Sequence, residues 1–363
     1  MSLRIAVIAH LRHPIAAPFM GGMEAHAWHL ARGLQDRGHQ VTLYAAGDSD
    51  PQFDLRPIIG RHYDQDYPWH DFHGTDVLNG VLDDAFARCV TALDDGGHDV
   101  VHNNSLHRFP PRHAFANRMP MVTSLHVPPF EGLRRAAQDS AAPWSRFTVC
   151  SRQQAGLWWP AGTPDGADIV GNGIDLRLWP FRPQGDGSAV WAGRITPTKG
   201  THLAAQAARM AGVPLTIFGV IEHRDYYNDM VRPLLGGDIR YGGHLQGGDL
   251  ATEMGRASAM LFTPQWEEPF GLVAIEGMAC GLPVASTRIG ATDEVIGDCG
   301  AFAAPDDAEG LAHALEQALQ IPRERPRARV ERLFSLERML DRYEENYRAA
   351  MDAARSGISA RAS

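Results

Sequence analysis

The stretch TPQWEEPFGLVAIEGMACGLPVAST, residues 263–287, decides the fold of this chain. The apolar run at 258–263 leads into it and predicts a buried strand. Pro269 suits the first position of a helix, because the N–H that proline lacks has no acceptor there, and Gly281 suits the end of that helix. The run PVAS at 283–286 predicts another strand. This order is one parallel βαβ unit with its acidic turn at the sheet edge where such folds bind ligands.

Two glutamates in this stretch, Glu268 and Glu276, are separated by seven residues. Eight helical steps of about 1.5 Å give a rise of about 12 Å between them, as an upper bound. Two carboxylates separated by about that distance cannot share one proton or one metal ion. They could hold two ends of an elongated ligand, faced by the amides of Phe270, Gly271 and Leu272 at the helix N-terminus. Alternatively, Glu268 only stabilises the helix dipole and Glu276 lies on a solvated face.

Length and composition indicate a globular protein of two domains, since 363 residues can bury two cores. The net charge of −9 argues against nucleic acid as a partner and does not indicate membrane association. The run at 3–9 is too short to span a membrane, and no N-terminal signal is visible. The cysteines follow no metal-ligand spacing, so we expect buried free thiols and a cytoplasmic protein. They are Cys89, Cys150, Cys280 and Cys299.

Strand and helix patterns alternate in both halves of the chain, which predicts two Rossmann-like parallel-sheet domains. A linker composition rich in proline and glycine occurs near Pro180 to Gly187. We therefore expect an N-terminal domain at 1–178, a linker at 179–187 and a C-terminal domain at 188–334, with a final helix at about 335–355 that packs back onto the first domain.

Two further stretches are open to interpretation. Segment 322–332 carries five arginines against two glutamates, and we interpret it as a solvated helix surface. Segment 47–75 is long and irregular, and such loops are often functional. Its aromatic and histidine side chains either line an acceptor pocket or pack beneath the loop. These are Tyr63, Tyr67, Trp69, His70 and Phe72.

The segment VWAGRITPTKG, residues 190–200, contains the only lysine among 34 basic residues. A predicted strand ends at Gly193, Arg194 and Lys199 bracket a turn, and a helix follows. Two cations and a helix N-terminus at the end of a strand suit a diphosphate. A compact ammonium retained in an arginine-rich chain favours phosphate contact over a surface role, which is the alternative.

Together these motifs resemble those of the family 4 glycosyltransferases of the GT-B fold. The resemblance rests on GGMEAHAWHLARGLQDRGHQV (21–41), SLHVP (124–128), GNGID (171–175), AGRITPTKG (192–200) and WEEPFGLVAIEGMACGLPV (266–284). It implies an α/β protein in which two Rossmann-like domains face a deep interdomain cleft. It also implies a retaining enzyme that moves a hexose-type sugar from a UDP- or GDP-type nucleotide sugar to a hydroxyl of a small-molecule or glycan acceptor.

The resemblance assigns catalytic roles to His126, Arg194, Lys199 and Glu268. Arg194 and Lys199 would neutralise the donor diphosphate and the charge that develops as the glycosidic bond breaks. Glu268 would hold sugar hydroxyls, Glu276 would hold the ribose hydroxyls, and His126 would lie near the anomeric side of the sugar.

The remaining donor contacts implied by the resemblance come largely from main-chain groups. Gly21 and Gly22 would bring N–H groups to the phosphates. The base would stack between the turns at 218–220 and 241–245, and Trp266 would narrow the base or sugar pocket. The donor-contact residues are Gly21, Gly22, Gly193, Gly219, Leu245, Phe270, Gly271 and Leu272.

No metal and no cofactor besides the nucleotide sugar is implied, because two cations can do the work of a divalent ion. No carboxylate is identified as a nucleophile for double displacement. We therefore expect front-face attack by the acceptor, with the departing phosphate taking its proton.

Two alternatives stay open: a nucleotide-sugar epimerase, which would need acids and bases around the sugar C2, and a nucleotide-sugar-binding protein without turnover. A dinucleotide oxidoreductase is disfavoured because the first strand is not followed by GxGxxG.

Overall fold

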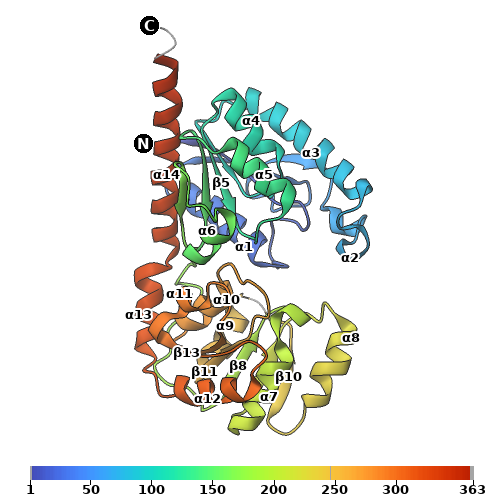
Figure 1. Cartoon of the computed structure of the whole chain (residues 1–363), viewed down its shortest axis with the longest axis vertical. Coiled ribbons are helices and arrows are strands. Elements are labelled where there is room, and N and C mark those ends of the chain that lie inside the picture. Colours follow the sequence, from blue (N-terminus) through green and yellow to red (C-terminus); the bar gives the residue numbers. More distant parts are fainter. Residues whose placement is uncertain (1, 246, 360–363) are drawn as a thin grey trace. The chain divides into compact units, whose positions relative to one another are not determined.

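The computed structural model describes residues 2–245 and 247–359, which form two compact units (Figure 1). Unit 1 contains the chain up to Cys150, then Ala155–Val170, and again the chain from Leu336 onward. Unit 2 contains Ser151–Gln154 and Gly171–Ser335, so residues 179–187, where we expected a linker, belong to it.

Unit 1 is built on a parallel sheet whose seven described strands have the order β3-β2-β1-β4-β5-β6-β7. This order reverses direction beside β1, as in doubly wound folds. The strands are β1 Arg4–Ile8, β2 Gln40–Ala46, β3 Asp54–Ile59, β4 Val100–Asn103, β5 Met121–Leu125, β6 Ser145–Val149 and β7 Ala167–Ile169.

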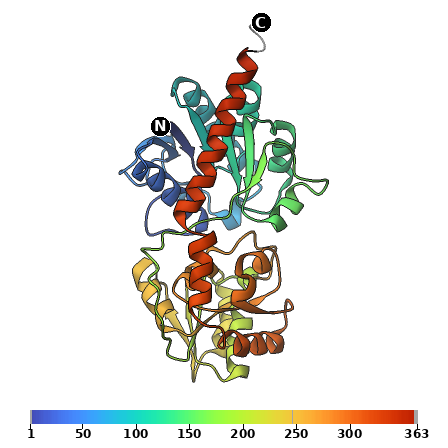
Figure 2. The same ribbon diagram turned by 90° about the vertical axis from the view of Figure 1, so that its left-hand side faces the viewer.

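Helices cover both faces of this sheet because successive strand residues point to opposite sides. Ile5 and Val7 of β1 pack with side chains of α1 and α14, whereas Ala6 and Ile8 pack with those of α3. Figure 2 shows α14 as the long red helix lying across the sheet of this unit. The helices are α1 Gly22–Asp36, η1 Tyr63–Gln65, α2 Trp69–Phe72, α3 Asp76–Asp95, α4 Phe109–Asn117, α5 Glu131–Ser140, α6 Arg152–Trp158, which begins in unit 2, and α14 Leu336–Ser359.

The segment at 47–75 is more regular than expected, since it contains β3 and two short helices. Tyr63 is 2% exposed, and Tyr67, Trp69 and Phe72 pack against the same core cluster. His70 is largely exposed. Of the two interpretations of the aromatic residues, packing beneath the loop is the one that the structure favours.

Unit 2 is built on a second parallel sheet, with the described strands in the order β10-β9-β8-β11-β12-β13. The strands are β8 Ala189–Ala192, β9 Leu215–Phe218, β10 Ile239–Gly243, β11 Ala259–Phe262, β12 Val284–Thr287 and β13 Gly300–Ala303. The helices are α7 Thr201–Ala211, α9 Gly247–Arg256, α10 Leu272–Ala279, α11 Thr292–Ile296, α12 Ala308–Ala318 and α13 Glu324–Leu333. Shorter helical turns are η2 Pro197–Lys199, α8 Arg224–Tyr226, η3 Tyr227–Val231, η4 Arg232–Leu234 and η5 Gly297–Cys299.

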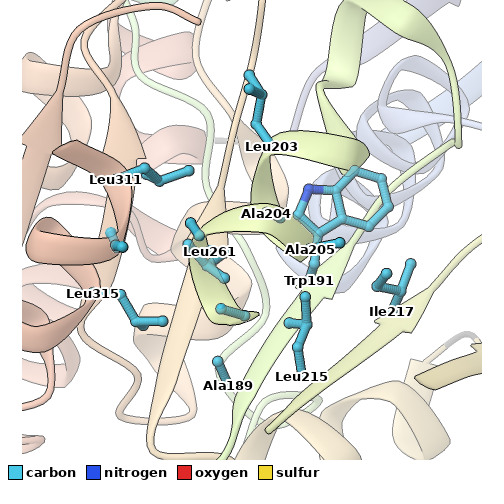
Figure 3. Close-up of a cluster of buried hydrophobic side chains, with 14 of the residues drawn as sticks. Ala189, Trp191, Leu203, Ala204, Ala205, Leu215, Ile217, Leu261, Leu311 and Leu315 are labelled. Carbon is cyan, nitrogen blue, oxygen red and sulfur yellow. The ribbon is translucent and has the colours of Figure 1, made fainter. Parts of the chain in front are cut away.

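One face of this sheet packs against α7 and α12 (Figure 3). Trp191 of β8 lies in that core with Leu203 of α7, Leu215 of β9 and Leu311 of α12. All four side chains are at most 4% exposed. The buried strand fixes where the loop after β8 leaves the sheet, and that loop carries Arg194 and Lys199.

The helix of the deciding stretch begins later than the sequence predicted. Pro269 is not its first residue; α10 begins at Leu272, after Gly271 in the left-handed region at φ 91°. Only glycine adopts that conformation readily, and it turns the chain sharply from the acidic loop into the helix.

The interpretation of 322–332 as a solvated surface was wrong for three of its five arginines. Arg323 donates to the carbonyl oxygens of Ala257 (2.6 Å), Arg182 (2.8 Å), Gly255 (3.1 Å) and Cys280 (3.2 Å). The Arg327 and Arg329 guanidinium groups likewise donate to main-chain carbonyls of unit 2. Helix α13 and the residue before it are therefore tied to unit 2 through main-chain carbonyls, several of which lie near the C-terminal ends of α9, α10 and α11.

All four cysteines are buried, as expected, and none of them forms a disulfide. Across the described residues, no helix combines the length and the apolar character that crossing a membrane requires.

We predict that Arg323→Ala destabilises the protein by about 2 kcal/mol, because it leaves several carbonyls without their donor. Arg325→Ala is the matched control, since Arg325 makes an exposed ion pair with Asp298 at 2.6 Å and such pairs contribute little. Urea unfolding of the two variants measures the difference, and equal losses would show that the carbonyl contacts are not stabilising.

Candidate functional site

Thr263, at the end of β11, joins two loops that leave adjacent strands of unit 2. Its hydroxyl oxygen accepts a hydrogen bond from Trp191 Nε1 at 3.0 Å. Its hydroxyl hydrogen is directed at the carbonyl oxygens of Lys199 (2.9 Å) and Gly200 (3.0 Å). The side chain is almost completely buried. The loop that carries Lys199 is thereby fixed against the loop that carries Glu268.

Close approach of these loops requires a glycine at position 200. Gly200 has φ 61°, and a Cβ there would lie 2.3 Å from the carbonyl oxygen of Thr263. A second backbone contact, from Gln265 N to Thr198 O at 2.8 Å, continues the pairing of the two loops. Any side chain at 200 would separate them.

The result is a compact charged group made of Lys199, Glu268 and Trp266. The Lys199 ammonium lies 2.6 Å from Glu268 Oε2, and Trp266 Nε1 donates to the same oxygen at 2.8 Å. The ammonium also lies 5.2 Å from the centroid of the indole ring, within range of a cation–π attraction. The Glu268 side chain is 8% exposed and that of Lys199 22%. The carboxylate is therefore desolvated, and the ammonium remains open to a ligand.

Arg194, the other expected cation, makes an ion pair of its own. It lies 2.7 Å from Glu222, and both side chains are more than a third exposed. Such a pair is weak in water, so an anionic ligand could take the place of Glu222. Sequence reasoning did not identify Glu222; the bridge between Ile195 and Ile221 is what brings it beside Arg194.

The N-terminus of α10, directly after the loop that carries Glu267 and Glu268, presents main-chain N–H groups that could bind a ligand. Leu272 and Val273 have no intrahelical acceptor for their N–H groups, whereas Ala274 N donates to Gly271 O at 3.0 Å. The Phe270 side chain is buried against Phe334, with ring centroids 5.4 Å apart. Phe270 therefore anchors the turn, and only its main chain could contact a ligand.

Glu276 does not lie on a solvated face. It is in the middle of α10, and burial raises its pKa to about 7, although its side chain keeps partial access to solvent. A partly exposed carboxyl in an apolar setting is typical of a ligand-binding position. The interpretation of Glu276 as surface decoration is therefore disfavoured.

The glycines expected near the base have a packing function. A Cβ on Gly219 would lie 1.7 Å from the Gly193 carbonyl oxygen, so the two loops touch through their main chains. Gly219 N donates to Gly243 O at 2.9 Å, and Gly219 O accepts from the Tyr241 hydroxyl at 2.8 Å. Leu245 lies in the partly exposed loop after β10. Base contacts at these positions stay predictions.

Gly21 and Gly22 lie in unit 1 at the start of α1, with Gly21 as the N-cap. Glu24, in the first turn, is 4% exposed, and one of its carboxylate oxygens would lie 3.0 Å from a Cβ on Gly21. Gly21 thus makes room for a carboxylate that favours this positive helix end. Phosphate contact by the two glycines stays a prediction.

His126 follows β5 in unit 1 and belongs to a buried polar cluster. Its Nε2 lies 3.2 Å from Asn104 Oδ1, and its ring lies 4.2 Å from that of His26. Burial lowers the pKa of His126 to about 4, so the imidazole is neutral at pH 7. Sequence reasoning missed Asn104 and His102, although both stand at the end of β4, which pairs with β5.

The structure therefore places Arg194, Lys199, Glu268 and the α10 N-terminus around adjacent strand ends of unit 2, with Glu276 further along α10. His126, Gly21 and Gly22 belong to unit 1. Among the residues described, no group of three or more histidine, cysteine, aspartate or glutamate side chains is arranged to hold a metal ion.

Comparison with protein families gives matches over both parts of the chain. Residues 20–178 match the model described as Glycosyltransferase Family 4, and residues 181–332 match the one described as Glycosyl transferases group 1. The chain belongs to the family 4 glycosyltransferases and is an enzyme that transfers glycosyl groups.

Similar proteins of known name include the glycogen synthase of Mycobacterium tuberculosis, which is 29% identical over 92% of this chain and 91% of that protein. The D-inositol 3-phosphate glycosyltransferase of Thermobispora bispora is 25% identical over 79% of each chain.

Solved structures show the same GT-B fold. Sucrose-phosphate synthase from Thermosynechococcus elongatus superposes with a TM-score of 0.78, at 21% identity over 97% of this chain and all of that chain. The Anabaena protein HepE in complex with UDP-glucose gives a TM-score of 0.72, at 18% identity over 94% of this chain and 98% of that one.

We predict that Glu276 makes stability fall as the pH rises from about 4.5 to 7. Its pKa of about 7 in the folded protein exceeds its ordinary value of 4.5, so in that window the folded state holds a proton that the unfolded chain has released. Glu276→Gln should therefore gain thermal stability relative to the wild type between pH 5 and pH 8. Glu267→Gln, at an exposed neighbouring carboxylate, is the control, and a parallel pH dependence in Glu276→Gln and the wild type would contradict the assignment.

Proposed function

We propose that this enzyme is a retaining glycosyltransferase that moves a hexose-type sugar from a UDP- or GDP-type nucleotide sugar to a hydroxyl of a small-molecule or glycan acceptor. The observation that carries the proposal is the contact between Lys199 and Glu268 at 2.6 Å, beside the open N-terminus of α10. This contact places Lys199, which would bind phosphate, next to Glu268, which would bind sugar hydroxyls, within the same unit.

Each group then binds a different part of the donor. Lys199 and Arg194 exchange their carboxylate partners for phosphate oxygens, which carry more charge and accept hydrogen bonds in several directions. Glu268 accepts hydrogen bonds from sugar hydroxyls, while Trp266 Nε1 keeps its carboxylate oriented. Glu276 accepts from the ribose hydroxyls, and desolvation strengthens those bonds.

The chemical step follows from this arrangement. The bond between the anomeric carbon and the diphosphate oxygen breaks, and Lys199 and Arg194 stabilise the charge that the leaving oxygen gains. The acceptor oxygen forms the new bond on the same face, and its proton passes to the departing phosphate. Trp266 Nε1 continues to donate to Glu268 Oε2 once Lys199 contacts the phosphate, which supports a binding role for this carboxylate over a nucleophilic one.

The same two cations support a reaction without a metal ion or a cofactor, since they supply the positive charge that a divalent ion would otherwise provide. His126 is neutral at pH 7 and is proposed to contact a substrate hydroxyl without protonating the leaving group.

We predict that Lys199→Ala lowers kcat by about two to three orders of magnitude, as expected for loss of one preorganised contact to the leaving group. Arg256→Ala is the control, because Arg256 also pairs with a carboxylate, Glu253 at 2.6 Å, at the far end of α9. Initial rates over a range of donor concentrations separate kcat from KM, and a change confined to KM would contradict the role of Lys199.

The donor is tested with a panel of nucleotide sugars, by detecting nucleotide release with and without candidate acceptors in the presence of a chelator. UDP-glucose belongs in the panel because HepE, a protein of the same fold, is described in complex with UDP-glucose. We expect release from at least one UDP- or GDP-hexose. Release from none of them, or only after a divalent metal is added, would overturn the corresponding part of the proposal.

A further inference from the structure

A chain of buried hydrogen bonds in unit 1 runs from the C-terminal helix to His126. Tyr347 and Tyr343 of α14 face His102 of β4 and Ser124 of β5, and all four residues are at most 1% exposed. The Tyr347 hydroxyl lies 2.7 Å from His102 Nδ1, and Ser124 Oγ lies 3.1 Å from His102 Nε2. The cluster contains no element of the expected catalytic machinery except His126.

The position of the proton on His102 follows from its partners. Ser124 Oγ also lies within hydrogen-bond distance of Thr148 Oγ1 (2.9 Å) and Tyr343 Oη (3.2 Å), so its single hydrogen does not decide the tautomer. Asn104 Oδ1 does, because it lies 3.1 Å from His102 Nε2 and an amide oxygen only accepts, so Nε2 carries the hydrogen. Burial lowers the pKa of His102 to about 3, so the ring is neutral, and its Nδ1 accepts from Tyr347.

The Asn104 amide oxygen faces two imidazole rings, and because it only accepts, the nitrogen nearest to it on each ring must be a donor. The same oxygen lies 3.2 Å from Nε2 of His126. His126 Nε2 must then also be a donor.

We propose that Asn104 is a positioning residue that holds His126 in the tautomer with hydrogen on Nε2, leaving Nδ1 as an acceptor for a substrate hydroxyl. The tautomer itself follows from the hydrogen bonds, whereas the substrate hydroxyl rests on the proposed function. His126 in this state accepts a hydrogen bond and cannot donate one from Nδ1. It therefore favours a hydroxyl over a phosphate or carbonyl oxygen at that position.

The buried Asn104 amide lowers the stability of the fold, which supports a functional reason for its presence. Asn104 is 1% exposed, and within the described part of the chain its Nδ2 has no hydrogen-bond partner. A buried amide with an unsatisfied donor destabilises a fold, so stability alone does not explain an asparagine here. The titratable groups beside His126 are His26 from α1 and His102 from β4, and Tyr343 from α14 faces both of these rings. None of the three supplies a negative charge at neutral pH.

The tautomer is tested on the full chain by two-bond nitrogen–proton NMR of protein labelled with ¹⁵N-histidine. His126→Gln identifies the signal of His126 among those of the 17 histidines. We expect a protonated Nε2 and an unprotonated Nδ1 at pH 7.5, and loss of that preference in Asn104→Ala. Hydrogen on Nδ1 in the wild type, or an unchanged tautomer in Asn104→Ala, would overturn the proposal.

A pH profile tests what the tautomer does in the reaction. Asn104→Asp sets a carboxylate beside His126 Nε2, which should raise the pKa of His126 towards neutrality and convert Nδ1 into a donor. We expect the kcat/KM of this variant to fall by about tenfold for each unit of pH below the new pKa, and to approach the wild-type value above it.

Asn103→Asp is the matched control, because Asn103 is also buried but its side chain contacts Thr123 and Ser105. Identical pH profiles for the two variants would overturn the role of Asn104. Absence of transfer from every donor, with the expected tautomer still present, would contradict the proposed function and leave the hydrogen-bond assignment standing.

Discussion

The buried hydroxyl of Thr263 is the contact on which the unit 2 site depends. It takes a hydrogen bond from Trp191, a core residue, and gives one to the main chain beside Lys199. The position of the only lysine is therefore set by the packed interior and not by the flexibility of its own loop. Because Gly200 lets the loops touch, the ammonium reaches the Glu268 carboxylate without an intervening water.

The candidate site residues of the two units differ in charge. In unit 2, Arg194 and Lys199 are each paired with a carboxylate, and the pair of Arg194 with Glu222 is exposed, so a charged ligand can replace Glu222 at little cost. In unit 1, burial lowers the pKa of His26, His102 and His126 and keeps these three imidazoles neutral. Among the candidate site residues, the charged pairs therefore lie in unit 2, whereas His126 of unit 1 is neutral and hydrogen-bonded.

Much of the fold could be predicted from the sequence because apolar strands alternate with helices at regular intervals. The charged site was also predictable in part, since Arg194, Lys199 and Glu268 stand at strand ends. Contacts between residues distant in sequence were not predictable, as for Glu222 beside Arg194 and the carbonyl of Ala257 beside Arg323. The start of α10 was missed because Pro269 suggested an earlier first residue than Leu272. The tyrosines of α14 meet His102 across more than 240 positions, and no local pattern encodes that contact.

The central claim is that Lys199 and Glu268 bind different parts of one donor. Isothermal titration with a nucleoside diphosphate and with its nucleotide sugar, on the wild type, Lys199→Met and Glu268→Gln, tests it most directly. The account predicts that Lys199→Met weakens binding of both ligands. Glu268→Gln should weaken only the nucleotide sugar and leave the diphosphate bound as tightly or more tightly, because Lys199 is released from its pair. Equal losses for both ligands in both variants would contradict the account.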